Sequence, residues 1–434
     1  MKITALLFLI VSFTIPIFSN VPLQKAIDNG IRINSEIQNN DLEARILEVD
    51  NKIKNSNRYF SISGSAGYLY RSEKIDIKLP DLEIGPGMSM SGLTIGGGTN
   101  NNYDLSISLH QPIFTGNALS GMVKINELQK ILNLSKRSFL ELMLSGRIKT
   151  VFLNHQLLIS QSNSLITLDK KISNHLKKLE DLYEEDLVGK SQVLETRLKY
   201  REISLSKEEV ENNIYILAST FMELTGYRIK NIEKEHKEIV EDPETSIELF
   251  VRNHPNLRIL SDQKKIINIS KKITRGKDLP QIGGFAEFHY GVPGFNFLGD
   301  EWTSYFQGGI EVKMKVFDWG RSRKENIIND YKIEKLSNQE QDLVRRTRMR
   351  LSELFNTLKS LKARIGTFDE MIAISIEESE LKMMMFDEKQ ISNKDYLDSV
   401  LNVENLRSLK EKTSLQSDLI KVEINTMIGK KGEK

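Results

Sequence analysis

The residues of this chain that could do chemistry do not form a catalytic or metal-binding pattern. The glycine run 96–98 lacks both the lysine and the strand-to-helix context of a phosphate-binding loop. There is no nucleophile elbow and no Ser/His/Asp order. The histidines also lack metal-ligand spacings such as His-Glu-x-x-His; they are His110, His155, His175, His236, His254 and His289. We therefore predict no enzyme, no metal site and no cofactor.

Two charged groups remain to be explained. Asp395 and Asp398 lie three residues apart in a helical stretch, so both carboxylates point the same way. Most acid pairs at this spacing only solvate a helix face. Four arginines inside a long helix favour a solvated or tunnel-lining face over an anion site; they are Arg345, Arg346, Arg348 and Arg350. The net charge of +2 argues against nucleic acid as the main partner.

The composition is that of a folded, exported protein of 434 residues. Residues 1–19 read as a secretory signal, with Lys2 at the positive end, an apolar run from Ala5 to Phe18, and cleavage near Ser19. The alternative is a retained membrane anchor. No later stretch is apolar for long enough to span a bilayer as a helix. The chain has no cysteine, which excludes disulfides, thiolate metal sites and an acylated N-terminal cysteine.

Four segments have the period of two that is typical of a strand with one apolar and one polar face. In the second of them Leu105, Ile107 and Leu109 alternate with Ser106 and Ser108. We predict strands over about 58–72, 103–115, 281–291 and 303–317. A long loop, rich in Gly, Ser, Met and Asn, is expected over residues 71–102.

Helical periodicity fills most of the rest of the chain. We predict helices over residues 21–55, 117–182, 192–224 and 247–272, another from 320, and a last one to about 427. Interruptions at 184–190 and near Lys389 make two long helical hairpins. At ~1.5 Å per residue, the helix over 117–182 would reach about 100 Å.

The chain reads as two copies of one unit. Phe114 and Phe317 end equivalent strands 203 residues apart, and matching residue classes continue at this offset as far as Leu198 and Leu401. We therefore divide the chain into a signal peptide (1–19), repeat 1 (20–226), a charged connector (227–243), repeat 2 (244–428) and a C-terminal tail (429–434).

Four two-faced strands cannot close a barrel in one chain, because the outer strands would leave exposed edges. A membrane accepts strands only in a closed barrel. The strands must therefore be buried in a soluble sheet or shared among subunits. The helices are too long for a compact domain, which favours sharing.

At this point the sequence resembles a known family. Residues 111–114 (Gln-Pro-Ile-Phe), 279–282 (Leu-Pro-Gln-Ile) and 316–321 (Val-Phe-Asp-Trp-Gly-Arg) resemble motifs of the TolC family of bacterial outer-membrane efflux and export channels. The resemblance covers nearly all of the mature chain. It implies an α+β fold in which three subunits, each with four strands, form one outer-membrane β-barrel continued by a long α-helical barrel.

The resemblance extends to the ends of the two hairpins. The family pattern there is an aromatic residue, Gly three residues later, Asp six after the Gly, and Leu two further. Phe386 and Asp395 fit, with Lys389 in place of Gly. In the first copy Tyr183 fits, whereas Asp186 replaces Gly and Gln192 replaces the acid. The resemblance implies an adaptor-binding tip and involves Tyr183, Asp186, Gly189, Gln192, Phe386, Lys389 and Ile391.

Asp395 and Asp398 match the positions whose carboxylates line the closed periplasmic entrance in this family. An Arg expected five residues after the aromatic is Ile391 here. If an interaction within this region holds the entrance closed, the candidate residues for it are Lys389, Lys394 and Asp186. At the hairpin turns the family's glycine supplies a positive φ, and Asp186 and Lys389 stand in its place here.

The function that the resemblance implies is a passive homotrimeric duct of a tripartite efflux or type I secretion system. Its partners would be outer-membrane lipid, a periplasmic adaptor (membrane fusion) protein, and an inner-membrane RND or ABC transporter. Multidrug resistance would be one consequence. The helical part would lie in the periplasm. The alternative is a periplasmic coiled-coil adaptor or scaffold without a pore, which should have a single helical hairpin.

Overall fold

The computed structural model describes residues 21–90, 92, 94–232, 239–296 and 298–430. The predicted signal peptide and parts of the connector and tail lie outside these residues. The chain divides into two compact units. The first, here called the helical unit, takes the described residues of Met1–Asp41, Ser135–Arg258 and Gln341–Lys434. The second, the sheet unit, takes Leu42–Leu134 and Ile259–Glu340.

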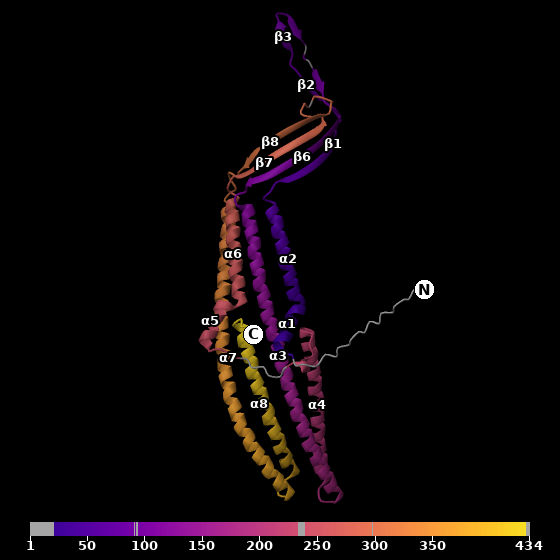
Figure 1. Ribbon diagram of the computed structural model, residues 1–434, viewed down its shortest axis with the longest axis vertical. Coiled ribbons are helices and arrows are strands. Elements are labelled where there is room, and N and C mark those ends of the chain that lie inside the picture. The colour runs from indigo at the N-terminus through magenta and orange to yellow at the C-terminus, as the bar shows by residue number, and fades with distance from the viewer. Residues whose placement is uncertain (1–20, 91, 93, 233–238, 297, 431–434) are drawn as a thin grey trace, which may run out of the picture. The chain divides into compact units, whose positions relative to one another are not determined.

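The sheet unit is built on one antiparallel four-stranded sheet (Figure 1). Its strands are β1 (Ser61–Tyr70), β6 (Asn101–Phe114), β7 (Gln281–Val292) and β8 (Thr303–Lys313), in the spatial order β1-β6-β7-β8. The last strand ends sooner than the predicted residue 317. Lys313 lies opposite Gln281, the first residue of β7, and Pro280 before it has no N–H that could extend the ladder. The Asp318 carboxylate then accepts hydrogen bonds from the backbone N–H groups of Arg321 (3.1 Å) and Ser322 (3.3 Å), which starts the next helix.

The strand register separates the side chains of the sheet into two faces. Ile107 lies opposite Gly64 and Phe288, and Phe288 lies opposite Phe306. One residue on, Ser108 lies opposite Ser63 and Glu287, and Glu287 opposite Gln307. The first set belongs to an apolar face and the second to a polar face. The predicted alternation is therefore kept across all four strands.

The expected long loop over 71–102 contains regular structure. Strands β2 (Ile75–Lys78) and β5 (Thr94–Gly97) pair, and so do β3 (Leu82–Gly85) and β4 (Met88–Met90). The prediction of a loop without strands was wrong. The glycines that suggested a loop also make a tight reversal possible, because Gly87 takes a φ of 87° between β3 and β4.

Two predicted helices are each broken in two. Residues 21–55 form α1 (Leu23–Ile33) and α2 (Ser35–Ser56), because the Asn34 side chain accepts a hydrogen bond from the Ile37 N–H (3.0 Å) and starts a new helix. The predicted helix over 247–272 is α5 (Pro243–Asn253) followed by α6 (Pro255–Gly276). Pro255 disfavours a helical conformation at His254, so the chain bends there.

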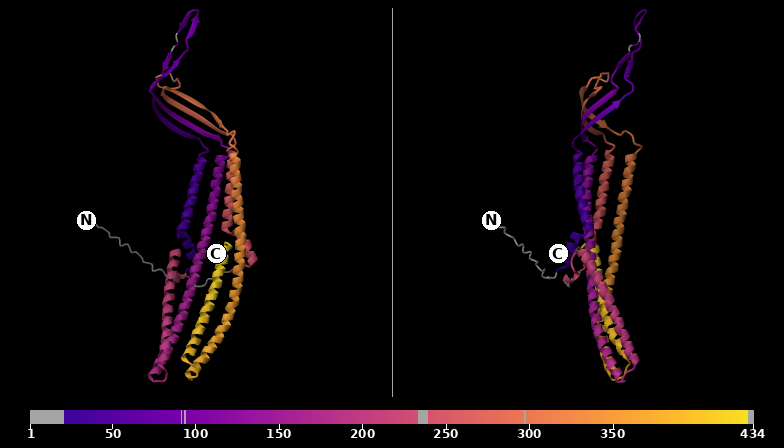
Figure 2. Two further views of the ribbon diagram at one scale, coloured as in Figure 1. Left: turned by 180° about the vertical axis from the view of Figure 1, so that it is seen from behind. Right: turned by 90° about the vertical axis from the view of Figure 1, so that its right-hand side faces the viewer.

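The long helices form two hairpins, whose turns lie in the helical unit (Figure 2). One consists of α3 (Ala118–Glu184) and α4 (Lys190–Thr225), the other of α7 (Arg321–Asp387) and α8 (Asn393–Met427). A 3₁₀ turn, η1 (Ile229–Asn231), follows the first hairpin. Among the described residues, no helix is long and apolar enough to cross a membrane.

Several helices have the same length in the two halves. Both α3 and α7 have 67 residues, and they begin 203 residues apart. Both α2 and α6 have 22 residues. Positive backbone φ angles recur at the 203-residue spacing, in the pairs Gly116/Trp319, Asn117/Gly320, Asp186/Lys389 and Gly226/Gly429. Each pair lies at an end of a long helix.

The core of the helical unit is also paired. One cluster is centred on Ile148, Phe152 and Phe221, all fully buried. A second is centred on Leu351 and Ile424, which follow Ile148 and Phe221 by 203 residues. A third cluster, with Leu168, Ile172, Ile203, Leu397 and Val400, packs the two hairpins together near their ends.

In the sheet unit, two chain segments approach so closely that only glycine fits. A Cβ built on Gly276 would lie 1.7 Å from the carbonyl oxygen of Gly116, and one on Gly116 would lie 1.9 Å from that of Gly276. We expect Gly276→Ala to lower the free energy of unfolding by roughly 1–3 kcal/mol, because the backbones must separate. Thermal unfolding in detergent measures this.

Gly366→Ala is the matched control, since Gly366 lies inside α7 and a Cβ there would meet nothing within 4 Å. That change should stabilise the protein by about 0.5–1 kcal/mol through helix propensity. If both variants shift the unfolding temperature in the same direction, the close approach at Gly276 does not limit the fold.

Candidate functional site

The candidate site is the end of the helical unit where both hairpins turn. Helices α3 and α7 end in the same hydrogen-bond pattern. The N–H of Asp186 bonds to the carbonyl of Tyr183 (3.0 Å) and that of Leu187 to the carbonyl of Leu182 (2.9 Å). The corresponding bonds, 203 residues later, are Lys389 to Phe386 (2.9 Å) and Gln390 to Met385 (2.8 Å). These paired bonds define a Schellman motif.

A Schellman motif needs a left-handed residue, for which glycine is the usual choice. Here Asp186 (φ 59°) and Lys389 (φ 63°) take that conformation without being glycine. The sequence showed that glycine is missing from both tips. The structure shows that the turn it would make is kept, at a backbone cost of about 1 kcal/mol or more at each residue.

The following helices begin differently in the two hairpins. Gly189 precedes α4 and has no side chain with which to cap it. Ser392 precedes α8, where its hydroxyl accepts the Asp395 N–H (3.2 Å) and the Asp395 carboxylate accepts hydrogen bonds from the N–H and hydroxyl of Ser392. This is a capping box. The Ser392 hydroxyl and N–H lower the pKa of Asp395, so this carboxylate is ionised at neutral pH.

Asp398 is exposed on the same side of α8 as Asp395. Their charges reach Lys382, whose pKa is raised mainly by a hydrogen bond to Glu378 and further by these two acids. The predicted interactions that would hold the entrance closed do not form within the protomer. In the described part of the chain, the side chains of Lys389, Lys394 and Asp186 make no hydrogen bond or ion pair. Ile391 is half-buried and apolar, and also makes none.

A histidine that the sequence did not single out joins the two hairpins. Nε2 of His175, on α3, lies 2.7 Å from Oδ1 of Asn393, at the start of α8. The Asn393 amide NH₂ donates to the Thr196 hydroxyl (3.1 Å) on α4. Because that amide nitrogen is occupied as a donor, Oδ1 accepts, and Nε2 of His175 carries the proton.

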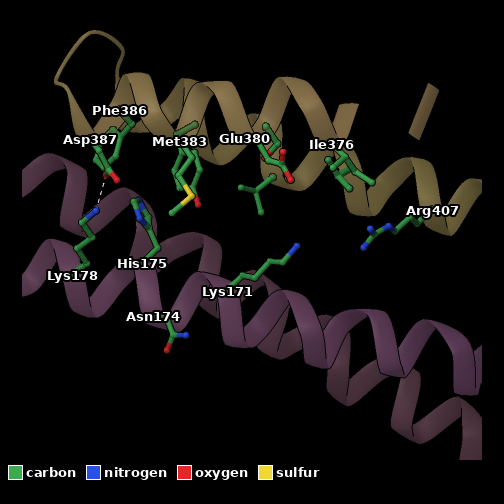
Figure 3. Close-up of a pocket in the computed structure, with 14 residues that line it drawn as sticks. Lys171, Asn174, His175, Lys178, Ile376, Glu380, Met383, Phe386, Asp387 and Arg407 are labelled. Carbon is green, nitrogen blue, oxygen red and sulfur yellow. Dashed lines mark hydrogen bonds and ion pairs between the residues drawn. The ribbon is translucent and has the colours of Figure 1, made fainter. Parts of the chain in front are cut away.

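The His175 ring packs edge-on against two aromatic rings. Its centroid is 5.3 Å from that of Phe386 and 4.8 Å from that of Tyr396, and these two rings stack on each other at 5.7 Å (Figure 3). Burial lowers the pKa of His175 below its ordinary value, and the hydrogen bond to Asn393 only partly offsets this. Lys178 lowers the pKa further, and Asp387 raises it. His175 is therefore neutral at pH 7.

Ion pairs bridge the hairpins beside His175. Lys178 Nζ lies 2.6 Å from the Asp387 carboxylate (Figure 3). Lys171 Nζ lies 3.6 Å from the carboxylate of Glu404. Glu404 is buried and also pairs with Arg407 (3.0 Å). A cavity of about 540 Å³ lies between these groups. The hairpin ends are thus held together by a buried polar contact, packed aromatic rings and two ion pairs.

The predicted tip residues fall into two groups. Tyr183 is 40% exposed, and the turn residues Asp186 and Lys389 are exposed as well. The backbone carbonyl of Gln192 accepts the Thr196 hydroxyl (2.9 Å) within α4 and the Asn393 amide (3.5 Å) from the other hairpin. Phe386 packs inside the protomer against His175, so only part of it remains at the surface.

A signal for His175 was present in the sequence. It occupies a core position of the heptad-like pattern that runs through Leu168, Ile172 and Leu179, where the other members are apolar and buried. A histidine at such a position must find a hydrogen-bond partner. No sequence pattern identified Asn393 as that partner, because it lies 218 residues away.

Comparisons with known proteins bear on the fold. No protein-family model and no curated protein sequence matches the chain. Among solved structures, a membrane protein from Pseudomonas aeruginosa superposes with a TM-score of 0.76 at 11% identity, covering 96% of this chain and 92% of the other. The channel protein CusC gives 0.75 at 9% identity, with 94% and 91% covered.

The outer-membrane protein VceC of Vibrio cholerae gives a TM-score of 0.71 at 12% identity, with 94% and 96% covered. The chain therefore has the fold of the outer-membrane channel proteins. The resemblance to such channels that the sequence suggested is confirmed at the level of the fold.

The His175 contact leads to a testable pH dependence. Because the pKa of buried His175 is lower than that of an exposed histidine, about 6.5, the opened hairpin end binds a proton more readily than the packed one. The packing should therefore weaken as the pH falls below about 6.5. Hydrogen exchange of peptides covering residues 171–182, corrected for intrinsic rates, should show less protection at pH 5.5 than at pH 7.5.

The matched control is His175→Gln, which keeps a side-chain N–H donor for Asn393 but takes up no proton. Its protection should be the same at both pH values. Equal losses of protection in the wild type and the variant would show that another group causes the pH dependence.

Proposed function

We propose that this chain is one subunit of a trimeric outer-membrane channel, a passive duct of a tripartite efflux or type I secretion system. The fold that it shares with outer-membrane channels supports the proposal. The observation that carries it is the sheet, which has an apolar face, a polar face and two free edges.

The apolar face is exposed in the single chain. Ile107 is 57% exposed, Phe306 70% and Ile310 72%. Exposed apolar surface of this extent marks contact with lipid or with another protein. Strands of 10 to 14 residues are also long enough to cross a bilayer at a tilt, which takes about 9–11 residues.

The two ends of the sheet carry exposed aromatic rings. At one end Tyr103 lies 5.0 Å from Tyr68 and 5.7 Å from Trp302, and Trp302 lies 5.0 Å from Tyr290. At the other end the exposed rings belong to Tyr59, Phe60, Phe317 and Trp319. Aromatic girdles at both interfaces are typical of outer-membrane barrels. This supports a lipid-facing role for the apolar face.

The free edges support assembly. Strands β1 and β8 each pair with one neighbour in the described chain. In a bilayer unpaired N–H and C=O groups are too costly, so a sheet of four strands must close with other copies. The family fold implies three. Exposed apolar side chains on the long helices support side-by-side packing of the copies, for example Leu198 (66%) and Ile374 (67%).

We also propose that residues 1–19 direct export, and that the chain consists of two repeats over 20–226 and 244–428, joined by the connector 227–243. The equal lengths of α3 and α7 and the left-handed residues at a fixed spacing support the duplication.

The hairpin ends would form the periplasmic entrance. Asp395 and Asp398 of three subunits would make a ring of acids, and the exposed turns at Asp186 and Lys389 would contact an adaptor protein that links the duct to an inner-membrane RND or ABC transporter. The alternative of a coiled-coil adaptor is weaker, since an adaptor has a single hairpin and this chain has two.

The lipid-facing assignment is tested by arginine substitution on the two faces of β6. Ile107→Arg should destabilise the assembled protein by about 2–4 kcal/mol if it lies near the bilayer midplane, and Ser108→Arg by much less, because Ser108 faces the lumen. Unfolding from lipid vesicles by guanidinium gives both values. Equal tolerance at the two positions would contradict the membrane-spanning sheet.

The acid ring is tested by changing Asp395 and Asp398 together to Asn. Asn is preferred over Ala because Asp395 also caps α8, and losing the cap would cost about 1 kcal/mol. We expect the double variant to lose most of its cation selectivity and its block by trivalent cations, since charged rings select ions in pores. Single-channel reversal potentials across a salt gradient measure the selectivity.

Glu208→Gln with Glu211→Gln is the matched control, as these exposed acids also lie three apart on a helix, α4. It should keep the selectivity of the wild type. If the Asp395 and Asp398 variant keeps it too, the two acids are ordinary solvated side chains.

A further inference from the structure

The four places where the chain passes between the sheet and the helices are strongly basic. Together the segments 52–60, 115–124, 271–280 and 313–325, here called the basic collar, hold thirteen Lys or Arg and three Asp or Glu, a net charge of +10. The whole chain has a net charge of only +2. This concentration of charge is therefore a local feature of the sheet unit.

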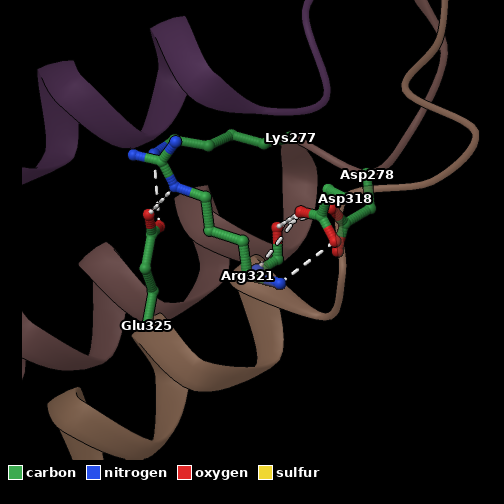
Figure 4. A network of polar contacts seen from close by, with 6 residues as sticks. Lys277, Asp278, Asp318, Arg321 and Glu325 are labelled. Carbon is green, nitrogen blue, oxygen red and sulfur yellow. Dashed lines mark hydrogen bonds and ion pairs between the residues drawn. The ribbon is translucent and has the colours of Figure 1, made fainter.

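The four segments lie at one end of the sheet. The strand register brings the start of β1 opposite the end of β6 (Ser61 with His110), and the start of β7 opposite the end of β8 (Gln281 with Lys313). Direct contacts join them as well. The Gln111 amide donates to the carbonyl of Arg58 (3.1 Å), and the Ser322 hydroxyl donates to the Asp278 carboxylate (2.6 Å) (Figure 4).

The acids of the collar already have partners. Asp318 accepts backbone N–H groups at the start of α7, and Asp278 accepts the Ser322 hydroxyl. Glu325 pairs with Arg321 (3.1 Å) and Lys277 (3.5 Å) (Figure 4). Exposed cations of the collar without an ion pair in the described part of the chain are Lys52, Arg58, Lys272, Arg275, Lys315, Arg323 and Lys324. Their charge is uncompensated.

An exposed aromatic pair accompanies these cations. Trp319 is 81% exposed and Phe317 is 71% exposed, with their ring centroids 5.0 Å apart. Trp319 also holds a φ of 58°, where the equivalent residue 203 positions earlier is Gly116. A large ring kept at the surface in a strained backbone conformation indicates a role at that surface.

The opposite end of the sheet has the opposite charge. The segments 71–100 and 293–302 hold three Lys or Arg and six Asp or Glu. Of these two ends of the sheet, only the helix end has a net positive charge. Aromatic rings with Lys and Arg are the side chains that suit the boundary between lipid tails and anionic headgroups.

We propose that the basic collar binds the phosphate headgroups of anionic glycerophospholipids in the membrane leaflet next to the helices. The inference rests on the proposed placement of the sheet in the outer membrane. The apolar sheet face meets the lipid tails, and Trp319 lies at the headgroup level. Lys315 precedes Trp319 by four residues, and Arg323 and Lys324 lie in the first turn of α7. Anionic lipid supplies the charge that the collar lacks.

The chain contains its own probe for this binding, because it has two tryptophans, one at each end of the sheet. Trp302→Phe leaves Trp319 as the only one. The full-length variant is reconstituted in phosphatidylcholine vesicles that contain a small fraction of dibrominated phosphatidylglycerol or dibrominated phosphatidylcholine. Bromine quenches a tryptophan that it touches, so quenching reports which lipid gathers at Trp319.

We expect brominated phosphatidylglycerol to be enriched at Trp319 by at least about threefold over brominated phosphatidylcholine at low salt. At about 0.5 M salt, where the screening length is about 4 Å, the enrichment should fall. Adding Lys315→Gln, Arg323→Gln and Lys324→Gln should remove it. Lys335→Gln, Lys359→Gln and Lys362→Gln, which delete three exposed cations further along α7, should not.

Trp302 in a Trp319→Phe variant should show no preference for the anionic lipid. Equal quenching of Trp319 by both lipids, or an enrichment that survives loss of the three collar cations, would overturn the proposal. Loss of the enrichment on adding millimolar soluble glycerol phosphate would also overturn the proposal, because it would mean a site for free phosphate esters. If neither lipid quenches Trp319, the segment lies outside the bilayer, and the proposed membrane placement fails as well.

Discussion

The structure depends on one constraint, which is that backbone N–H and C=O groups at a sheet edge must be paired. Strands β1 and β8 leave two such edges, and the sheet has apolar side chains on one face and polar side chains on the other. In an isolated soluble domain the edges would stay unpaired and the apolar face would be exposed to water. Closure with further copies in a membrane satisfies both, and the remaining parts of the proposal follow from that closure.

The two halves of the chain share backbone geometry at a fixed spacing. The left-handed residues at the ends of the long helices keep their spacing even where glycine has been replaced, as at Asp186 and Lys389. Backbone geometry is therefore more persistent than residue type. This agrees with a structural likeness to channel proteins that is clear at 9–13% identity.

Much of the fold could be predicted because it is periodic. Strand faces, hairpin turns and helix lengths each leave a local pattern of period two or 3.6. Where side chains override the pattern, prediction failed: Asn34 caps a new helix in the middle of an apolar stripe, and residues 71–102 form paired strands although they are rich in glycine. The early end of β8 at Lys313 has another origin, because Pro280, which precedes the paired Gln281 on β7, has no N–H for the ladder.

The candidate site was predictable only in part. Asp395 and Asp398 could be found by spacing, but the capping box that engages Asp395 depends on the geometry at Ser392. The contact between His175 and Asn393 joins residues 218 apart, and no local pattern encodes such a distance. The basic collar is spread over four segments, so it becomes visible only when the strand register places them at one end of the sheet.

Closure of the sheet between copies is the central claim, and the absence of cysteine from the chain allows a direct measurement. Cysteines placed at Ser63 on β1 and Gln307 on β8 mark the two free edges, and a short bis-maleimide is added to native outer membranes. The account predicts cross-linked dimer and trimer with no larger product, and none from either cysteine alone. Only monomer, or a ladder that continues beyond trimer, would contradict it.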